Sequence, residues 1–226
     1  DDGHGLARRL IEGPGLRALR RNALAFLVLG VVGVAGFNAA LFLGMQSSSP
    51  VTAALIMGTS PLTTNLLEAL IGGHWPSRRA LFGMAISLVG VALTVGAFSG
   101  ARFASGDLLI FAGSLAWAFY TIGCRRWVRA ASPLETSAWT MLAGAAALLI
   151  AAFTLEDPLA IAAAASPTAW GATLWMALVG SVLAYLFWQV GIARRGPAAT
   201  SALFNLVPVA ALLVATAFGR IPAPTQ

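Results

Sequence analysis

Charged residues are scarce in this chain, and lysine is absent altogether. Only 10% of the 226 residues are charged, whereas 58% are hydrophobic and the mean hydropathy is +0.83. A soluble globular domain has about 25% charged residues, because its surface faces water. The shortage of charge therefore excludes an ordinary soluble domain and indicates a chain embedded in lipid.

The residues that build metal and catalytic sites are nearly as scarce. Cys124 is the single cysteine, which excludes an internal disulfide and a multi-cysteine metal site. His4 and His74 lie outside the apolar stretches, and there is no Ser-His or HExxH arrangement, so we expect no enzyme, metal or cofactor. Without lysine the chain cannot form a retinal Schiff base. The pI near 11.2 does not indicate nucleic acid, because the arginines lie in short pairs between apolar runs.

Apolar stretches long enough, or nearly long enough, to cross a membrane recur along the chain. A crossing helix needs about 20 mostly apolar residues. The intervening loops contain polar and helix-ending residues, and none is long enough to form a separate domain. We therefore predict an all-α, polytopic bundle of transmembrane helices, with a short interfacial helix at 160–165. The predicted spans are 24–45, 51–72, 80–98, 108–124, 135–154, 170–192 and 198–218.

Arginine supplies all fourteen basic residues, and it is distributed unevenly over the two sides of the predicted bundle. One side holds only Arg102 and Arg220. The other side holds Arg8, Arg9, Arg17, Arg20, Arg21, Arg78, Arg79, Arg125, Arg126, Arg129, Arg194 and Arg195. Basic residues accumulate in cytoplasmic loops. We therefore expect a multi-pass protein of the cell (inner) membrane, with its Arg-rich loops in the cytoplasm and the lipid bilayer as a partner.

A shift of 147 residues superimposes helix-shaping residues from two distant parts of the chain. The coinciding pairs are Gly33 with Gly180, Gly44 with Gly191, Pro50 with Pro197, Pro61 with Pro208, and Gly72 with Gly219. The shift places the first predicted span on the sixth and the second on the seventh. Five spans is an odd number, so the second copy enters the membrane in the opposite direction. This pattern predicts an inverted-topology repeat of five-helix units, which is typical of secondary transporters.

The same offset predicts how the chain is divided between the two repeat units. Two complete units would contain ten helices, of which seven are present here, so we expect two further spans before residue 1 and one after residue 226. The predicted divisions are a cytoplasmic basic segment at 1–23, the last three helices of the first unit at 24–98, an external linker at 99–107, and the first four helices of the second unit at 108–226.

Three passages resemble the EamA-type family of the drug/metabolite transporter superfamily. Gly106-Asp107-Leu108-Leu109 through Trp117 to Arg125-Arg126 resembles the opening helix of that family's second repeat. The segments 62–90 and 206–226 resemble later helices of the two repeats. The sequence departs from the family where a Gly-Glu pair is usual, since Gly73-His74 and Gly219-Arg220 stand there. The resemblance implies a transporter that exports small metabolites, amino acids or drug-like compounds by alternating access.

Polar side chains inside the predicted spans are the candidates for a substrate site, because such groups are costly in hydrocarbon. Thr52, Ser60, Thr64 and Glu68 are spaced by multiples of four and share one helix face. Glu68 is the one acidic residue inside a span apart from Glu135, which is the first residue of its span. Glu68 is a candidate binding or coupling acid, or it extends to the interface. The pocket candidates within the transporter hypothesis are Asn38, Ser60, Thr64, Asn65, Trp117, Tyr185 and Asn205.

Two prolines, Pro61 and Pro208, fall near the middles of their predicted spans, where a proline breaks the helix and suits a cavity wall. Their neighbours Asn65 and Asn205 could bind either a substrate or another helix. Tyr120, Trp188 and Gln189 could belong to an interfacial belt on position alone. A passive channel or structural helix bundle remains the alternative function, although nothing in the sequence resembles a selectivity filter or a charged ring.

Overall fold

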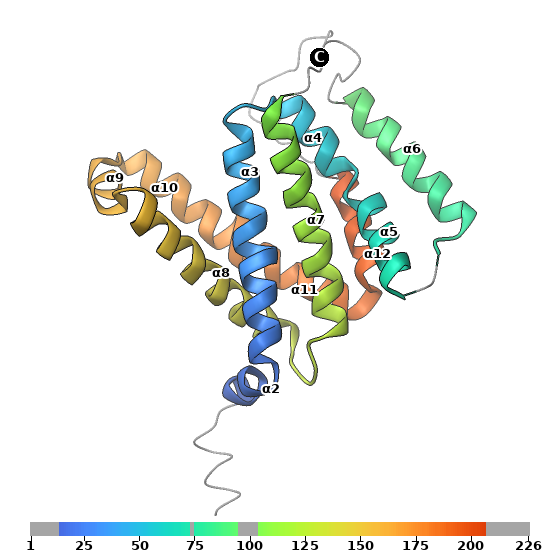
Figure 1. Ribbon diagram of the computed structural model, residues 1–226, viewed down its shortest axis with the longest axis horizontal. Helices are drawn as coiled ribbons and strands as arrows, with labels where there is room; N and C mark the ends of the chain where they lie inside the picture. The colour runs from blue at the N-terminus through green and yellow to red at the C-terminus, as the bar shows by residue number, and fades with distance from the viewer. Residues whose placement is uncertain (1–13, 73–74, 95–103, 207–226) are drawn as a thin grey trace, which may run out of the picture.

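The computed structural model describes residues 14–72, 75–94 and 104–206. Every regular element within these ranges is a helix, and the helices form a bundle from which α8, α9 and α10 lean away (Figure 1). Four continuous helices are long and apolar enough to cross a membrane: Gly15–Met45, Ser105–Arg126, Pro133–Leu155 and Pro167–Arg195. They coincide with four of the predicted spans, and the all-α polytopic bundle is confirmed.

The first long helix comprises α2 (Pro14–Val28), a π-helical segment η1 (Leu29–Gly36) and α3 (Phe37–Met45). It begins well inside the predicted basic segment 1–23. The helix kinks at Asn22, whose φ of −123° and ψ of 16° are not helical. The Asn22 side chain donates to the Arg129 carbonyl at 2.9 Å and accepts the Arg129 N–H at 2.8 Å. These two hydrogen bonds therefore hold the kinked helix α2 against the loop after α7.

The second predicted span is two helices, α4 (Pro50–Gly58) and α5 (Ser60–Gly72), separated at Thr59. The interruption lies two residues before Pro61, whose ring nitrogen cannot donate to the preceding turn. Ser49 caps α4 by accepting the Thr52 N–H at 3.0 Å. Helix α6 (Arg78–Thr94) covers the predicted third span over its described part and lies at the outer edge of the bundle (Figure 1).

Helix α7 (Ser105–Arg126) is the most enclosed of the four long helices, because 61% of the residues in its most apolar 18-residue stretch are buried. It starts three residues before the predicted span, within the predicted linker 99–107. The Asp107 carboxylate accepts the Ala104 N–H at 2.6 Å and a hydrogen bond from the Ser48 hydroxyl, and so stabilises an earlier helix start.

After α7, the described chain forms a long helical hairpin, which is followed by two short helices. Helix α8 (Pro133–Leu155) begins at a capping box in which Ser132 and Glu135 bond each other's backbone. The short predicted helix appears as α9 (Pro158–Ala164). The remaining elements are α10 (Pro167–Trp175), the π-helical η3 (Met176–Leu183), α11 (Ala184–Arg195), α12 (Pro197–Ser201) and the 3-10 helix η4 (Ala202–Leu206). The part of the predicted span 198–218 that follows residue 206, including Pro208, lies outside the described residues.

The 147-residue offset reappears in the backbone. The π-helical segments η1 and η3 have bounds that differ by 147 at both ends, and α4 and α12 begin at the equivalent Pro50 and Pro197. The equivalent helices run in opposite directions: η1 and α3 ascend in Figure 1, whereas η3 and α11 descend. π-helical turns are rare in proteins. Their coincidence in register therefore supports two related units of opposite orientation.

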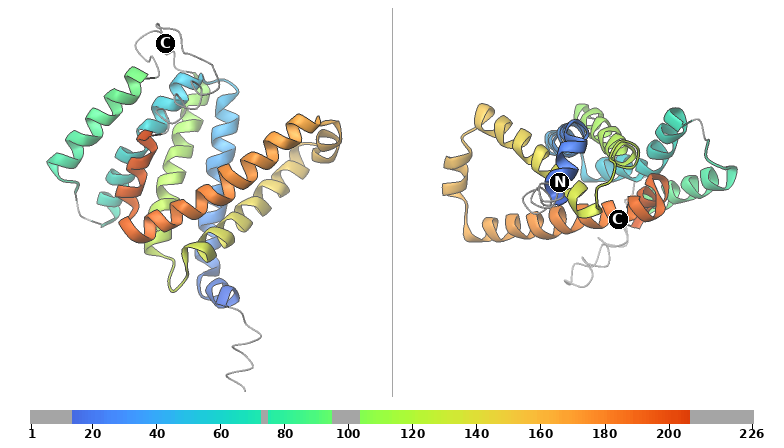
Figure 2. Two further views of the ribbon diagram at one scale, coloured as in Figure 1. Left: turned by 180° about the vertical axis from the view of Figure 1, so that it is seen from behind. Right: turned by 90° about the horizontal axis from the view of Figure 1, so that it is seen from below.

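The Arg-bearing ends of the described helices lie together. Helix α2 and the ends of α7 and α11 lie at the lower end of the bundle in Figure 1, and the start of α6 is the lower end of that helix; the reverse view in Figure 2 agrees. The described arginines at these ends are Arg17, Arg20, Arg21, Arg78, Arg79, Arg125, Arg126, Arg129, Arg194 and Arg195. The bundle thus has one basic end.

Candidate functional site

An aromatic cluster occupies the middle of the bundle, centred on Trp117 of α7. Its ring centroid lies 5.0 Å from that of Phe37, 5.3 Å from Tyr185 and 5.2 Å from Trp188. Trp117 and Tyr185 are 5% and 7% exposed. These two predicted pocket residues therefore lie together inside the protein, between helices of both units.

Asn38 of α3 joins this cluster across the two units. Its side-chain amide donates to the Val34 carbonyl at 2.7 Å and, more weakly, to the Tyr185 hydroxyl at 3.5 Å. Asn38 and Tyr185 are separated by 147 residues, so they occupy equivalent positions of the repeat. The two units therefore meet at equivalent residues, as expected of elements related by a two-fold axis.

The belt interpretation of Tyr120 and Gln189 is wrong. Tyr120 is 0% exposed and Gln189 is 3% exposed. The Gln189 amide donates to the Tyr120 hydroxyl at 2.7 Å and to the Cys124 thiol at 3.2 Å. Both side chains face the bundle interior, which position along a span cannot reveal. The signal was available in the spacing, because Gln189 lies four residues after Tyr185 and shares its helix face.

Trp188, the third residue of that interpretation, also points inward. Its indole N–H donates to the Thr121 hydroxyl at 3.1 Å, and its ring lies against Trp117 and Phe204. Thr121 was not identified from the sequence. A threonine in an apolar helix commonly bonds its own preceding turn, as Thr121 also does to the Trp117 carbonyl. Nothing in the sequence distinguished it.

The polar face of α5 packs toward α7. Ser60 lies 3.2 Å from Ser114 of α7, hydroxyl to hydroxyl, and both side chains are buried. Thr64 follows one turn later and is also fully buried. Glu68 comes after a further turn. Ser114 was missed by sequence reasoning, since only the packing of α5 against α7 places it opposite Ser60.

Three buried polar atoms lack a hydrogen-bond partner within the described part of the chain: Thr64 Oγ1, Trp117 Nε1 and Asn205 Oδ1. All three belong to residues that the sequence nominated for the pocket. Buried polar atoms are nearly always paired, since an unpaired one costs about 1–3 kcal/mol. Unpaired atoms at these places suit a solute or water that completes the bonding.

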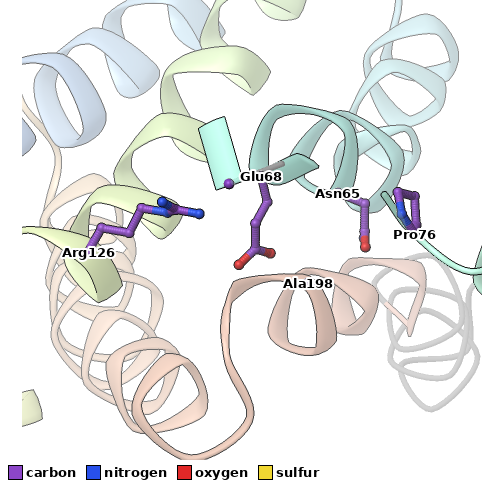
Figure 3. Close-up of a pocket in the computed structure, with 6 residues that line it drawn as sticks. Asn65, Glu68, Pro76, Arg126 and Ala198 are labelled. Carbon is purple, nitrogen blue, oxygen red and sulfur yellow. The ribbon is translucent and has the colours of Figure 1, made fainter. Parts of the chain in front are cut away.

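Two adjoining cavities lie beside α5, at the start of α12. The larger has a volume of about 480 Å³ and is lined by Pro61, Asn65, Ala80, Gly83, Met84, Ala198, Ala199, Ala202, Asn205 and Leu206. The smaller, of about 290 Å³, is lined by Asn65, Glu68, Gly72, Pro76, Arg126 and Ala198 (Figure 3). Asn65 and Ala198 border both cavities. Asn65 also donates to the Pro61 carbonyl at 2.7 Å.

Most of the predicted site residues fall into two groups. Asn38, Trp117 and Tyr185 form the central cluster, whereas Pro61, Asn65, Glu68 and Asn205 line the cavities. Ser60 and Thr64 lie on the α5 face that packs toward α7. No group of three potential metal ligands occurs among the described residues. The arrangement offers aromatic faces, amides, hydroxyls and the Glu68 carboxylate, and these groups can bind a solute.

Comparison with known proteins places this arrangement among transporters. A model of the EamA-like transporter family matches residues 9–96 and 104–226. The "Uncharacterized transporter YyaM" of Bacillus subtilis is 38% identical over 213 residues, which are 92% of this chain and 70% of that protein. The "Probable terminal-alkyne amino-acid exporter" of Streptantibioticus cattleyicolor is 26% identical, over 97% of this chain and 74% of its own. A solved crystal structure matches 98% of this chain and 76% of its own, with a TM-score of 0.75 and 23% identity.

Proposed function

This chain belongs to the EamA-like transporter family and is a multi-pass membrane transporter, not an enzyme, and we propose that it exports small organic metabolites by alternating access. In this mechanism the two units of opposite orientation rock against each other around a binding site between them. The site is exposed to one side of the membrane and then to the other.

The observation that supports this proposal is the contact between equivalent residues of the two units. Asn38 and Tyr185, 147 positions apart, lie within 3.5 Å of each other at the centre of the bundle. Secondary transporters with inverted repeats bind their substrates at such a repeat interface. The aromatic cluster around Trp117 therefore forms the proposed central site, and the unpaired Trp117 Nε1 is the donor that a bound solute would engage.

The break between α4 and α5 suits a part of the proposed site that moves during transport. Helix α4 ends at Gly58 and α5 begins at Ser60, so the backbone between them is free to bend without breaking a continuous helix. Thr64 lies in α5, after this interruption, and Asn205 lies on η4. Each has an unpaired buried side-chain oxygen. We propose that these oxygens gain hydrogen-bond partners as the units rock.

The chemistry of the site and the name of one relative support the proposed substrate class and the proposed direction of transport. The cluster offers aromatic rings and neutral polar groups, which suit a small solute with an apolar part. One relative is named a probable amino-acid exporter, so amino acids are among the proposed substrates, with other small metabolites and drug-like compounds. We place the basic end of the bundle in the cytoplasm, because arginine accumulates on that side of membrane proteins.

Counterflow in reconstituted vesicles tests the proposal. Vesicles loaded with an unlabelled solute should accumulate the labelled solute transiently, with a flux that saturates and is reduced by competitors. The passive channel is the alternative, and it predicts a flux proportional to concentration without counterflow. An absence of saturable flux across a broad panel of amino acids and small metabolites would contradict the transporter proposal.

Orientation is tested separately by cysteine labelling. In a Cys124→Ala background, Ser77→Cys lies next to the basic start of α6, and Glu156→Cys lies after the end of α8, which we expect on the other side of the membrane. A membrane-impermeant maleimide added to intact cells should label Glu156→Cys and not Ser77→Cys. The reverse pattern would place the basic end outside.

A further inference from the structure

Glu68 and Arg126 line the same 290 Å³ cavity at the basic end of the bundle without pairing with each other. Within the described part of the chain, neither side chain makes a hydrogen bond or an ion pair. Figure 3 shows Glu68 extending from α5 and Arg126 extending from the end of α7, with the cavity between them. Two opposite charges thus face one space while remaining separate.

A glycine at the end of α5 allows Arg126 to reach this cavity. A side chain at Gly72, the last residue of α5, would collide with the Arg126 guanidinium. The glycine therefore lets the arginine lie over the end of α5 and reach the cavity. An arginine at the end of a helix more commonly serves the helix dipole and the adjacent backbone. Its neighbour Arg125 donates instead to the Ala193 carbonyl, in the last turn of α11, at 3.2 Å.

The larger cavity adjoins this charged one and is mainly apolar. Pro61, Met84 and Leu206 contribute apolar walls to its 480 Å³, and Asn65 stands at the junction of the two cavities. The combined space therefore has a doubly charged half and an apolar half. It lies beside α5 and α12, apart from the aromatic cluster around Trp117.

We propose that these two cavities form one binding site for a zwitterion that has an apolar group, such as an α-amino acid with an apolar side chain. The carboxylate of the ligand binds Arg126, its ammonium binds Glu68, and its apolar group fills the cavity lined by Met84 and Leu206. Arginine matches the planar carboxylate, and charge-assisted bonds of this kind are the strong ones. The site rests on the proposed transport function, for which it captures substrate at the basic end.

Three related probes separate the two charges: L-phenylalanine, 3-phenylpropionate, which lacks the ammonium, and phenethylamine, which lacks the carboxylate. Binding is measured by calorimetry on the purified whole chain in lipid nanodiscs. The wild type should bind L-phenylalanine about tenfold or more tightly than either analogue, since each analogue loses one charge-assisted bond.

The variants assign each charge to its partner. Glu68→Gln should weaken L-phenylalanine and phenethylamine about tenfold and leave 3-phenylpropionate unchanged, whereas Arg126→Gln should weaken L-phenylalanine and 3-phenylpropionate and leave phenethylamine unchanged. Matched controls are Glu156→Gln and Arg125→Gln, which lie outside both cavities and should bind all three probes like the wild type. Retention of the wild-type tryptophan fluorescence and elution volume shows that a variant is folded.

A space-filling variant tests the apolar half. A side chain at Gly83 meets no described atom within 4 Å, so Gly83→Leu extends into the larger cavity without disturbing the helix. It should weaken L-phenylalanine and spare glycine, while Gly90→Leu on the same helix should affect neither.

Equal weakening of all three probes by Glu68→Gln or Arg126→Gln, or no weakening of L-phenylalanine by either, would overturn the site. Counterflow measured with the same purified chain, reconstituted in sealed vesicles instead of nanodiscs, distinguishes the failure of one proposal from the failure of the other. Saturable flux of some solute without L-phenylalanine binding overturns this site and leaves transport intact. The predicted binding pattern without saturable flux of any solute supports the site and contradicts transport.

Discussion

The glycines that the 147-residue offset pairs have very different surroundings, and substituting them should reveal that difference. Gly33 of η1 faces α7, and a Cβ placed there would lie 2.7 Å from Cγ and Cδ2 of Tyr120 and still closer to its Cβ. At Gly180, the equivalent position in η3, a Cβ would meet no described atom within 4 Å. Gly33→Ala and Gly180→Ala are therefore a matched pair.

The magnitude follows from these distances. Carbon atoms pack at about 3.5–4.0 Å, so Gly33→Ala must move η1 and α7 apart by about 1 Å. Overpacking of this kind costs about 1–3 kcal/mol of the free energy of unfolding. Gly180→Ala meets no such obstacle and gains up to about 1 kcal/mol from the better helix propensity of alanine. The two variants should therefore differ by about 1–4 kcal/mol.

Equilibrium unfolding in mixed micelles of mild detergent and SDS measures this difference, with tryptophan fluorescence as the signal, because Trp117 and Trp188 lie in the buried cluster beside Tyr120. Gly33→Ala should unfold at a lower SDS fraction than the wild type, and Gly180→Ala at the same or a higher fraction. Equal destabilisation by the two substitutions would refute the packing argument. A neutral Gly33→Ala would show that η1 does not lie against α7 as described.

Three further predictions concern other parts of the bundle. Trp117→Ala should abolish or strongly reduce counterflow while expression stays normal, and Tyr185→Ala should do the same; unchanged flux in both variants would remove these residues from the proposed central site. Asn22→Leu should lower the free energy of unfolding by about 1–3 kcal/mol, because both bonds to the Arg129 backbone are lost; an unaltered SDS midpoint would contradict this. Cys124, 6% exposed, should resist N-ethylmaleimide in the folded protein and react after SDS unfolding; rapid labelling of the folded protein would show that the helices around it open.

Much of the bundle could be predicted from the sequence, because apolar run length directly determines which segments can cross a membrane. The stretch predicted as 108–124 is the helix Ser105–Arg126, and the stretch 135–154 is Pro133–Leu155. The offset between the two units was equally accessible, since glycine and proline constrain the backbone whatever their neighbours. The π-helical form of η1 and η3 was not accessible, because the composition of these segments does not differ from that of an ordinary apolar helix.

The site was only partly predictable, because residue type does not determine which face of a helix meets which neighbour. Trp117 and Tyr185 were expected to line a pocket, and they lie in contact with each other, whereas Tyr120 and Gln189 were assigned by depth alone and face inward instead. Arg125 and Arg126 are adjacent and chemically identical. Successive residues of a helix point about 100° apart, so Arg125 contacts the Ala193 carbonyl whereas Arg126 lines the cavity.

The equivalent positions at the centre show how a repeated backbone could serve one direction of transport. Asn38 and Tyr185 occupy the same place in the two units, yet one contributes an amide and the other a phenol, so the backbones correspond while the side chains differ. On the proposed mechanism, corresponding backbones allow the inward-facing and outward-facing states to have similar energies, because each unit can adopt the conformation of the other. Different side chains at equivalent positions then give the solute different partners in each state. Replacing one residue by its counterpart, as in Asn38→Tyr or Tyr185→Asn, should therefore change the relative affinities measured from the two sides of the membrane more than it changes stability; equal affinities on both sides in the wild type and in both variants would contradict this.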